Sequence, residues 1–487
     1  MNFHCLKYLK KGLITRILTS LLFIFLYTSP VMASSKAGYS INVKVAGIKD
    51  TVCYLGNYYG DKQYLKDSAR VDASGRFTFK GEETLDGGIY LVILPDKKYF
   101  EIIVDKEQFF SIETSETDYV KHMKVKGSEE NLFFYEYLNY INPKGKEADN
   151  LNKLLGTIEN NEDSTKLIRE QMQKIDKEVV GYKTSFIAKH PGTFVAAIFN
   201  AMTEVEIPEA PVLENGRIDS TFKFRYYKEH YWDNINFSDD RLLRTPIYHS
   251  KLKKYMENLT MQIPDSINKE ASFVIEKAKS SPELFKYTVW FITNTYERSN
   301  IMGMDAVFVY LAEEYYMTNQ AYWIDSLQLA KITNRAKQLK WILIGKKAPN
   351  LIMKDINEKS YNLHNVAAKY TILYFWDPDC GHCQKITPAL KDVYNKYKSQ
   401  GVEAFAVCTE KDTAKWKKFV DEKELNWINV WDPYQLTSYK KIYDIYSTPV
   451  IYLLDEKKEI VAKRISVEQV EEYFERRLVN KDVNKKE

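Results

Sequence analysis

Residues 376–383 decide the fold of the last third of the chain and read Trp376-Asp377-Pro378-Asp379-Cys380-Gly381-His382-Cys383. They lie between an apolar, strand-like run, TILYFW at 371–376, and a helical pattern from Cys380 to about Lys398. A thiol at the start of a helix faces unpaired backbone N–H groups and the positive end of the helix dipole, and both favour the thiolate. The spacing lets the sulfur of Cys383 reach that of Cys380, so a mixed disulfide can be resolved within the chain. The stretch therefore predicts a redox-active dithiol.

Other chemistries of two cysteines at this spacing fit the sequence less well. A zinc site needs further soft ligands at comparable spacing, and Cys408 alone does not supply them. Attachment of a c-type haem requires histidine directly after the second cysteine, where this chain has Gln384. A purely structural disulfide stays open, although it leaves the position at a strand-to-helix junction unexplained. We therefore expect neither a metal nor a cofactor at Cys380 and Cys383.

The residues around the pair alternate between strand and helix patterns. VEAFAVC at 402–408 predicts a second buried strand, and a helix is expected near 414–423. Pro449 opens a third strand, PVIYLL, and a last helix is expected at 467–478. Buried strands that alternate with helices indicate a C-terminal α/β domain at 344–487.

This region resembles the thioredoxin superfamily, and most of all its exported TlpA/ResA-like branch. The residues that carry the resemblance are Ala348-Pro349, Phe375-Trp376, the Cys-Gly-His-Cys motif, Pro388 and Thr448-Pro449. The interval between Cys383 and Pro449 exceeds that of a minimal thioredoxin, as expected for the central insertion of the branch. The resemblance implies a thioredoxin-like fold and thiol-disulfide oxidoreductase activity.

The resemblance also implies roles for single residues. Cys380 would be the attacking thiol and Cys383 the resolving thiol, with Trp376 packed beside them. A cis peptide bond before Pro449 would hold Thr448 with its backbone free to pair with a substrate chain. The alternative for Pro449 is an ordinary proline at the start of a strand.

Two positions depart from the family pattern. Thioredoxins usually bury an acid six residues before the first cysteine, where this chain has Tyr374. ResA-like proteins usually have glutamate three residues after the second cysteine, where this chain has Ile386. The proton acceptor for the resolving thiol is therefore open, with Asp377, Asp379 and His382 as local candidates.

The direction of electron flow has conflicting signals. Gly381 keeps the turn open, and His382 can be cationic near the thiolate, which would stabilise the reduced form and make the disulfide more oxidising. The family branch implies instead a reductase that receives electrons across the inner membrane. We expect a reductase that exchanges disulfides with protein substrates and has an unidentified membrane electron donor, and the alternative is an isomerase- or oxidase-type dithiol enzyme. A peroxiredoxin would need threonine three residues before its cysteine, where Asp377 stands.

The N-terminus has the pattern of a secretory signal peptide. Residues 1–16 contain four basic side chains, the apolar run ILTSLLFIFLY follows at 17–27, and Val31-Met32-Ala33 offers a cleavage site. A retained membrane anchor is the alternative, but this run is short for a span of about 20 residues. Cys5 precedes the run, so it is not the lipid-modified cysteine of a lipoprotein. We expect cleavage after Ala33, a periplasmic protein and no stable membrane insertion afterwards.

Two further domains are expected between the signal peptide and the redox region. Short strand patterns such as INVKVAGI and GIYLVILP predict an antiparallel β-sandwich-like domain at 34–127, similar to the β-domain that precedes thioredoxin modules in exported Bacteroidetes proteins. Helical periodicity predicts an all-α domain at 128–343. The chain has 487 residues and a net charge of +4 from 70 basic and 66 acidic residues, so no nucleic-acid partner is expected.

These two domains contain no chemical motif, which leaves a function of another class open. They could recognise a partner in the cell envelope, with the redox module subordinate to binding. Cys53 and Cys408 fall in predicted buried strands, and we expect both to be free thiols.

Overall fold

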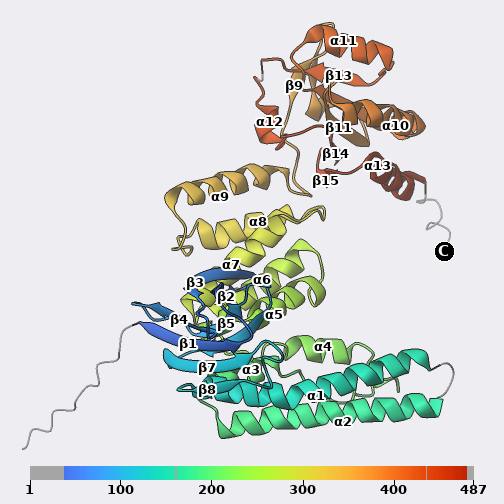
Figure 1. Cartoon of the computed structure of the whole chain (residues 1–487). Helices are drawn as coiled ribbons and strands as arrows, with labels where there is room; N and C mark the ends of the chain where they lie inside the picture. Colours follow the sequence, from blue (N-terminus) through green and yellow to red (C-terminus); the bar gives the residue numbers. More distant parts are fainter. Residues whose placement is uncertain (1–37, 159–161, 435, 480–487) are drawn as a thin grey trace, which may run out of the picture.

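The computed structural model describes residues 38–158, 162–434 and 436–479, which form a β-rich part, a helical part and an α/β part along the chain (Figure 1). This order confirms the predicted multidomain fold class. The predicted signal peptide at 1–33 lies outside the described residues. Within the described ranges, no helix combines the length and the apolar character that a membrane crossing needs.

The β-rich part contains two four-stranded sheets with the orders β4-β1-β7-β8 and β3-β2-β5-β6. The strands are β1 (Tyr39–Ala46), β2 (Val52–Tyr59), β3 (Lys62–Arg70), β4 (Arg76–Gly81), β5 (Gly88–Ile93), β6 (Tyr99–Val104), β7 (Phe109–Ser115) and β8 (Lys124–Lys126). Both sheets contribute to one core, and the alternating buried residues of β1 are typical of its strands. The strands pair antiparallel, as predicted, except for β1 and β7, which are parallel. The chain between these two strands passes through the other sheet and returns in the same direction.

The middle part is helical, as predicted. Its elements are α1 (Glu129–Thr157), α2 (Glu162–Lys189), α3 (Phe194–Met202), α4 (Phe222–Glu229), η1 (Asp240–Arg244), α5 (Pro246–Asn258), α6 (Pro264–Ala278), α7 (Pro282–Glu297), α8 (Asp305–Leu311), the π-helical turn η2 (Ala312–Tyr316), α9 (Ser326–Leu339) and η3 (Lys340–Ile342). Pro246, Pro264 and Pro282 stand in the first turn of their helices, where the missing N–H leaves no hydrogen bond unmade.

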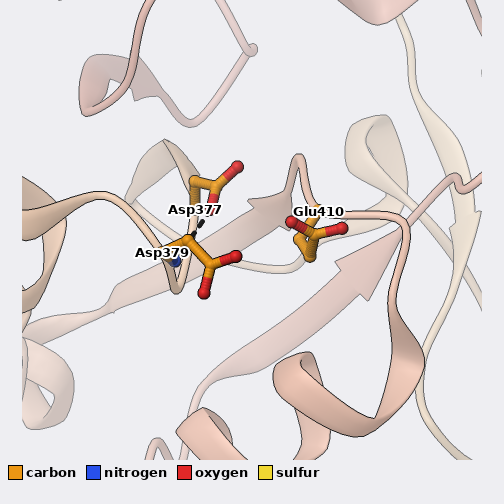
Figure 2. Close-up of side chains that lie close together, drawn as sticks. All are labelled: Asp377, Asp379 and Glu410. Atoms are coloured by element: carbon orange, nitrogen blue, oxygen red, sulfur yellow. Dashed lines mark hydrogen bonds between the residues drawn. The ribbon is translucent and has the colours of Figure 1, made fainter.

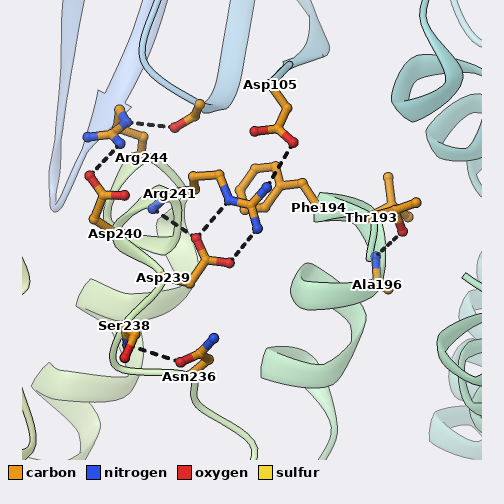
Figure 3. Close-up of polar contacts among 12 residues, drawn as sticks. Asp105, Thr193, Phe194, Ala196, Asn236, Ser238, Asp239, Asp240, Arg241 and Arg244 are labelled. Atoms are coloured by element: carbon orange, nitrogen blue, oxygen red, sulfur yellow. Dashed lines mark hydrogen bonds and ion pairs between the residues drawn. The ribbon is translucent and has the colours of Figure 1, made fainter. Parts of the chain in front are cut away.

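The arginines of η1 join the helical part to the β-rich part (Figure 3). Arg241 donates to Asp105 beyond β6 at 2.8 Å and to both carboxylate oxygens of Asp239 at 2.7 Å. Arg244 donates to the carbonyl oxygen of Gly87 at 2.6 Å. These partly buried, charge-assisted hydrogen bonds fix the sheet edge against the helices.

The C-terminal part is a mixed sheet of order β10-β9-β13-β12-β11-β14-β15. Its elements are β9 (Ile352–Lys354), β10 (Ser360–Asn362), η4 (Leu363–Asn365), β11 (Tyr370–Trp376), α10 (Gly381–Tyr397), η5 (Lys398–Gln400), β12 (Val402–Cys408), α11 (Thr413–Glu422), β13 (Ile428–Trp431), α12 (Tyr439–Ile442), β14 (Val450–Asp455), β15 (Ile460–Lys463), α13 (Val467–Phe474) and η6 (Glu475–Val479). Strands β11, β12 and β13 are parallel, while β14 runs antiparallel to β11.

The two faces of this sheet are covered from different parts of the chain. Side chains of α10, α11 and α13 pack on the face of β11 that carries Tyr374 and Trp376. On the opposite face, Phe375 shares a core with α12 and with Phe308 and Leu339 of the helical part. The predicted boundary at 343/344 thus crosses one continuous hydrophobic core, and helices α8 and α9 help to complete the α/β part.

Candidate active site

The Cys380–Cys383 motif lies at the edge of the C-terminal sheet where β11, β12 and β13 end and β14 begins. In the strand register Trp376 pairs with Cys408, and Cys408 pairs with Trp431 on the next strand. The first residue of β14, Val450, is aligned with Phe375. The segments that follow β11, β12 and β13, and the segment that precedes β14, therefore share the edge from which Cys380 begins helix α10.

Cys380 is held by the first turn of α10 and by the segment before β14. Its sulfur accepts a hydrogen bond from the backbone N–H of Cys383 at 3.5 Å, and its thiol donates to the carbonyl oxygen of Thr448 at 3.3 Å. Partial burial works against ionisation of Cys380, but hydrogen bonds from Cys383 and from the backbone of His382 outweigh it, so the pKa of the Cys380 thiol is lowered. This residue is the more readily ionised thiol of the pair.

Cys383 has the opposite environment. Its side chain is fully buried in the core beneath α10. Burial raises the pKa of the Cys383 thiol to about 12. The geometry thus separates an accessible thiol that ionises readily from a buried thiol that keeps its proton.

Alkylation should reveal this difference directly. With iodoacetamide near neutral pH we expect Cys380 to react and Cys383 to react more than about a hundredfold more slowly, because only the thiolate is the nucleophile. The Cys380 rate should rise with pH and level off below the pH expected for an ordinary cysteine. Peptide mapping by mass spectrometry after timed quenching measures both rates. Equal, slow rates with ordinary alkaline midpoints would contradict the electrostatic account of the pair.

The other predicted site residues lie around the two thiols. The peptide bond between Thr448 and Pro449 is cis. The Thr448 carbonyl oxygen accepts a hydrogen bond from the Cys380 thiol. Trp376 is fully buried and packs against Phe419 with ring centroids 4.8 Å apart. Gly381 and His382 are exposed in the first turn of α10.

The region that carries the motif is similar to known proteins. A sequence family described as the AhpC/TSA family matches residues 344–463. The chain is also similar to the thiol-disulfide oxidoreductase ResA of Bacillus cereus, with 32% identity over 139 residues that span 27% of this chain and 78% of the relative. This chain belongs to the thiol-disulfide oxidoreductase family. A ResA from Halalkalibacterium halodurans is 30% identical over 134 residues, which are 27% of this chain and 75% of that protein.

The rest of the chain and the solved structures extend the comparison. Two domains of unknown function, DUF4369 and DUF5106, match residues 39–134 and 157–340. A domain of a possible thiol-disulfide isomerase from Cytophaga hutchinsonii is 43% identical, covers 30% of this chain and 97% of its own, and has a TM-score of 0.27. A thioredoxin-like protein from Bacteroides caccae is 19% identical, covers 55% of this chain and 98% of its own, and has a TM-score of 0.43.

The position at which thioredoxins bury an acid is occupied by a hydrogen-bonded tyrosine in this family member. Tyr374 is fully buried, and its hydroxyl lies 2.8 Å from the hydroxyl of Thr387. Thr387 in turn donates to the carbonyl oxygen of Cys383 at 2.7 Å, so Tyr374 is the donor to Thr387. Tyr374 and the Cys383 thiol lie in the same buried cluster.

Three carboxylates gather beside the motif (Figure 2). Oxygen atoms of Asp377, Asp379 and Glu410 lie within 4.8 Å of one another. Asp377 accepts hydrogen bonds from the backbone of Asp379 and from the Thr409 hydroxyl, and Asp379 pairs with Lys415. Asp377 and Asp379 were candidates from the sequence, whereas Glu410 was missed. Its position directly after β12 was the available signal, because residues after parallel strands collect at one sheet edge.

The remaining described cysteines lie outside the pair. Cys53 and Cys408 are buried free thiols, as expected, and burial raises the pKa of both. Cys408 ends β12 behind the motif, whereas Cys53 lies in the core of the β-rich part.

Proposed function

We propose that this chain is an exported reductase of protein disulfides that acts through the Cys380-Gly381-His382-Cys383 motif. The observation that carries the proposal is the contrast between the two thiols: Cys380 has a lowered pKa at a helix start, and Cys383 is buried with a raised pKa. An attacking thiol needs to be ionised and accessible, whereas a resolving thiol acts only after the mixed disulfide has formed.

Reduction of a protein disulfide proceeds by two successive thiol-disulfide exchanges. The Cys380 thiolate attacks one substrate sulfur, the substrate S–S bond breaks, and the second substrate sulfur leaves with the electron pair and takes up a proton. Cys383 then loses its proton and attacks the Cys380 sulfur, which releases the first substrate sulfur as a thiolate. The substrate gains two electrons, and the chain is left with a Cys380–Cys383 disulfide. Two electrons from a donor, for which we propose a membrane protein, restore the dithiol.

The Cys383→Ser variant tests this sequence of steps. Without the resolving thiol the first step still proceeds, so a mixed disulfide with the substrate should accumulate and should disappear on addition of dithiothreitol. Non-reducing electrophoresis of the chain without residues 1–33, incubated with a peptide disulfide, measures the adduct. The wild-type chain should instead reduce the peptide disulfide to free thiols, in proportion to the Cys380–Cys383 disulfide that it forms. A Cys383→Ser chain that forms no adduct would contradict the proposal.

The direction of electron flow is tested by the reduction potential of the pair. Values of about −270 mV are typical of thioredoxin, whereas disulfide isomerase has a potential of about −180 mV. We expect the pair to lie toward the thioredoxin end after equilibration with glutathione buffers, read out by mass spectrometry of the alkylated cysteines. A potential at the isomerase end would favour the isomerase- or oxidase-type alternative.

We also propose that the protein acts in the periplasm, exchanges electrons with protein disulfides and thiols, and binds no nucleic acid. The basic and apolar N-terminal pattern supports export, and the balanced charge supports the absence of a nucleic-acid partner. Fractionation of cells that produce the full-length chain with a C-terminal tag tests the location. A full-size product in the cytoplasm would contradict it.

A further inference from the structure

Two adjoining hollows lie along helix α7, between the β-rich part and helix α9 (Figure 1). The first has a volume of about 200 Å³ and lies between the turn after β2 and α7. The second has a volume of about 280 Å³ and lies between α7, η2 and α9. Trp290 of α7 and Trp323, which precedes α9, line both hollows. The two therefore form one continuous depression, and the residues that line it all precede the C-terminal part.

The first hollow, the aromatic hollow, is lined mainly by aromatic rings. These are the rings of Tyr59, Tyr64, Tyr287, Trp290 and Trp323. Hydrogen bonds of two of them fix the turn after β2 against α7. The Tyr287 hydroxyl accepts from the N–H of Asp61 at 3.2 Å, and the Tyr59 hydroxyl donates to a carboxylate of α7 at 2.8 Å. Rings that are already held in place can contact the C–H face of a ligand without being ordered by it.

The second hollow, the polar hollow, contains a buried hydroxyl that has no hydrogen-bond partner. Thr293 lines this hollow and is 3% exposed, and among the described residues nothing bonds to its Oγ1 atom. The Tyr316 hydroxyl lies nearby, and Thr293 opposes the burial that raises the pKa of Tyr316, but the two hydroxyls do not reach hydrogen-bonding geometry. On the same helix, the Thr288 hydroxyl donates to the carbonyl oxygen of Leu284 at 2.6 Å. Because buried polar groups are normally paired, the Thr293 hydroxyl points to a ligand that supplies the missing partner.

The other polar side chains of the two hollows favour a ligand without net charge. They include Asp61, Lys62 and Lys286 in the aromatic hollow and Asn294, Glu297 and Lys331 in the polar hollow. An anion would face the two carboxylates, and a cation would face the three ammonium groups. A wholly apolar ligand would leave the Thr293 hydroxyl unpaired. A saccharide meets both conditions, because its hydroxyls donate and accept hydrogen bonds while the C–H faces of its rings contact aromatic rings.

We propose that the aromatic hollow and the polar hollow together bind a neutral oligosaccharide, with Trp290 and Trp323 as contact surfaces for its rings. Pockets for small molecules usually measure about 300–1,000 Å³, and each hollow alone is smaller, whereas the two together fall within this range. The ligand therefore has at least two sugar rings, one in each hollow. The site lies where the β-rich part meets the helical part, and ligand sites are frequent at such contacts. It uses neither cysteine of the motif, so it stands independently of the proposed function.

Calorimetric titration of the chain without residues 1–33 tests the site with defined probes. The neutral probes are maltotriose, cellotriose, mannotriose, xylotriose and chitotriose, and the trimers of galacturonate and of glucosamine are the anionic and cationic comparisons. We expect at least one neutral trisaccharide to bind with a Kd below about 1 mM and to change the tryptophan fluorescence, because two indole rings line the site. Absence of binding by every neutral probe, or binding of a charged trimer alone, would overturn the proposal.

Substitution of the two shared tryptophans locates the binding. Trp290→Ala and Trp323→Ala should each raise the Kd of the bound trisaccharide at least about tenfold, because each removes a ring that lines both hollows. Trp341→Ala is the matched control, since Trp341 is 68% exposed in η3 and lies outside the residues of both hollows. It should leave the Kd within about twofold. Equal losses of affinity in Trp341→Ala and Trp290→Ala would overturn the assignment to the two hollows.

Thr293→Val separates ligand binding from a structural role of the hydroxyl. Valine keeps the shape of the side chain and removes the unpaired hydroxyl, so the melting temperature should stay the same or rise. The Kd of the trisaccharide should rise about five- to tenfold, because the ligand loses a hydrogen bond. An unchanged Kd, or a lower melting temperature together with the loss of affinity, would overturn the proposal.

A double variant of the motif keeps this site apart from the redox reaction. Cys380→Ser combined with Cys383→Ser should bind the same trisaccharide with a Kd within about twofold of the wild-type value, because both cysteines lie outside the residues of the two hollows. A chain that binds the trisaccharide and reduces no disulfide would contradict the proposed function alone. Loss of trisaccharide binding in the double variant would overturn the separate site.

Discussion

Replacing Cys380 by serine is expected to lower the rate of disulfide reduction by at least about a thousandfold, because a serine hydroxyl is not ionised at neutral pH and cannot form the mixed disulfide. Every later step depends on that bond, so Cys383 cannot compensate: its pKa is about 12 and its sulfur is buried. Release of thiol from a peptide disulfide, followed with an indicator that itself does not react with the chain, measures the loss.

The control for this substitution is another cysteine of the same sheet. Cys408 is buried at the end of β12 and its thiol pKa is raised, so Cys408→Ala should keep most of the wild-type rate. Circular dichroism should show the same fold in both variants. Comparable activity in Cys380→Ser and wild type would mean that the attacking sulfur has been wrongly assigned, and a large loss in Cys408→Ala would mean that a third thiol takes part.

Much of the C-terminal fold could be predicted because its buried strands have no polar face. TILYFW and VEAFAVC are apolar on both sides, as expected for strands covered by helices on both faces, and they became β11 and β12. The helix after Cys380 was visible from its apolar spacing and extends over Gly381–Tyr397. The proline before β14 was assigned from the resemblance, since X–Pro alone does not specify the isomer.

The parts that the sequence did not predict depend on short elements and on long-range pairing. β13 has only four residues, Ile428–Trp431, which is too short for a periodic pattern, and β3 is almost wholly exposed and has no apolar alternation. The parallel pairing of β1 with β7 depends on a crossover through another sheet. Glu410 joins Asp377 and Asp379 only because β12 pairs with β11 in parallel register.

The core shared between the helical and the α/β part bears on the alternative function. Phe308, Ala336 and Leu339 belong to the same cluster as Phe375 of β11, two residues before Asp377. Arg335 and Gln338 of α9 contact Asp444 in the segment that leads to Thr448. A helical part that completes the redox sheet in this way supports the site directly, which favours the enzyme over a binding protein with a subordinate redox module.

The ion pair between Asp305 and Lys463 gives the largest expected effect on stability. The Lys463 side chain is 5% exposed and that of Asp305 is 21% exposed, and the ammonium also donates to the carbonyl oxygen of Ile342 at 2.8 Å. Asp305→Ala leaves this buried charge without its counter-ion, and we expect it to lower the free energy of unfolding of the α/β part by about 3–5 kcal/mol. Lys463→Met should have a much smaller effect, because Asp305 can still be hydrated. Calorimetry of the full chain measures both, and a second, earlier transition is expected in Asp305→Ala.

Two controls test whether the loss of stability in Asp305→Ala comes from an unpaired buried charge: an exposed ion pair and a change of pH. The pair between Lys340 and Glu313 joins the same region, but its side chains are 50% and 36% exposed, so Glu313→Ala should lower stability by less than about 1 kcal/mol.

Burial lowers the pKa of Lys463, and Asp305 counteracts that shift, so without Asp305 the folded-state pKa falls further. Between the lowered pKa of Lys463 in the folded chain and its pKa of about 10.4 in the unfolded chain, the unfolded chain binds more protons than the folded chain. The free energy of unfolding therefore rises with pH through that interval. The defect of Asp305→Ala should therefore shrink between neutral pH and about pH 10, because the lysine becomes neutral in the folded chain. A defect that is the same at both pH values would show that lost packing around Asp305, and not an unpaired charge on Lys463, destabilises the variant.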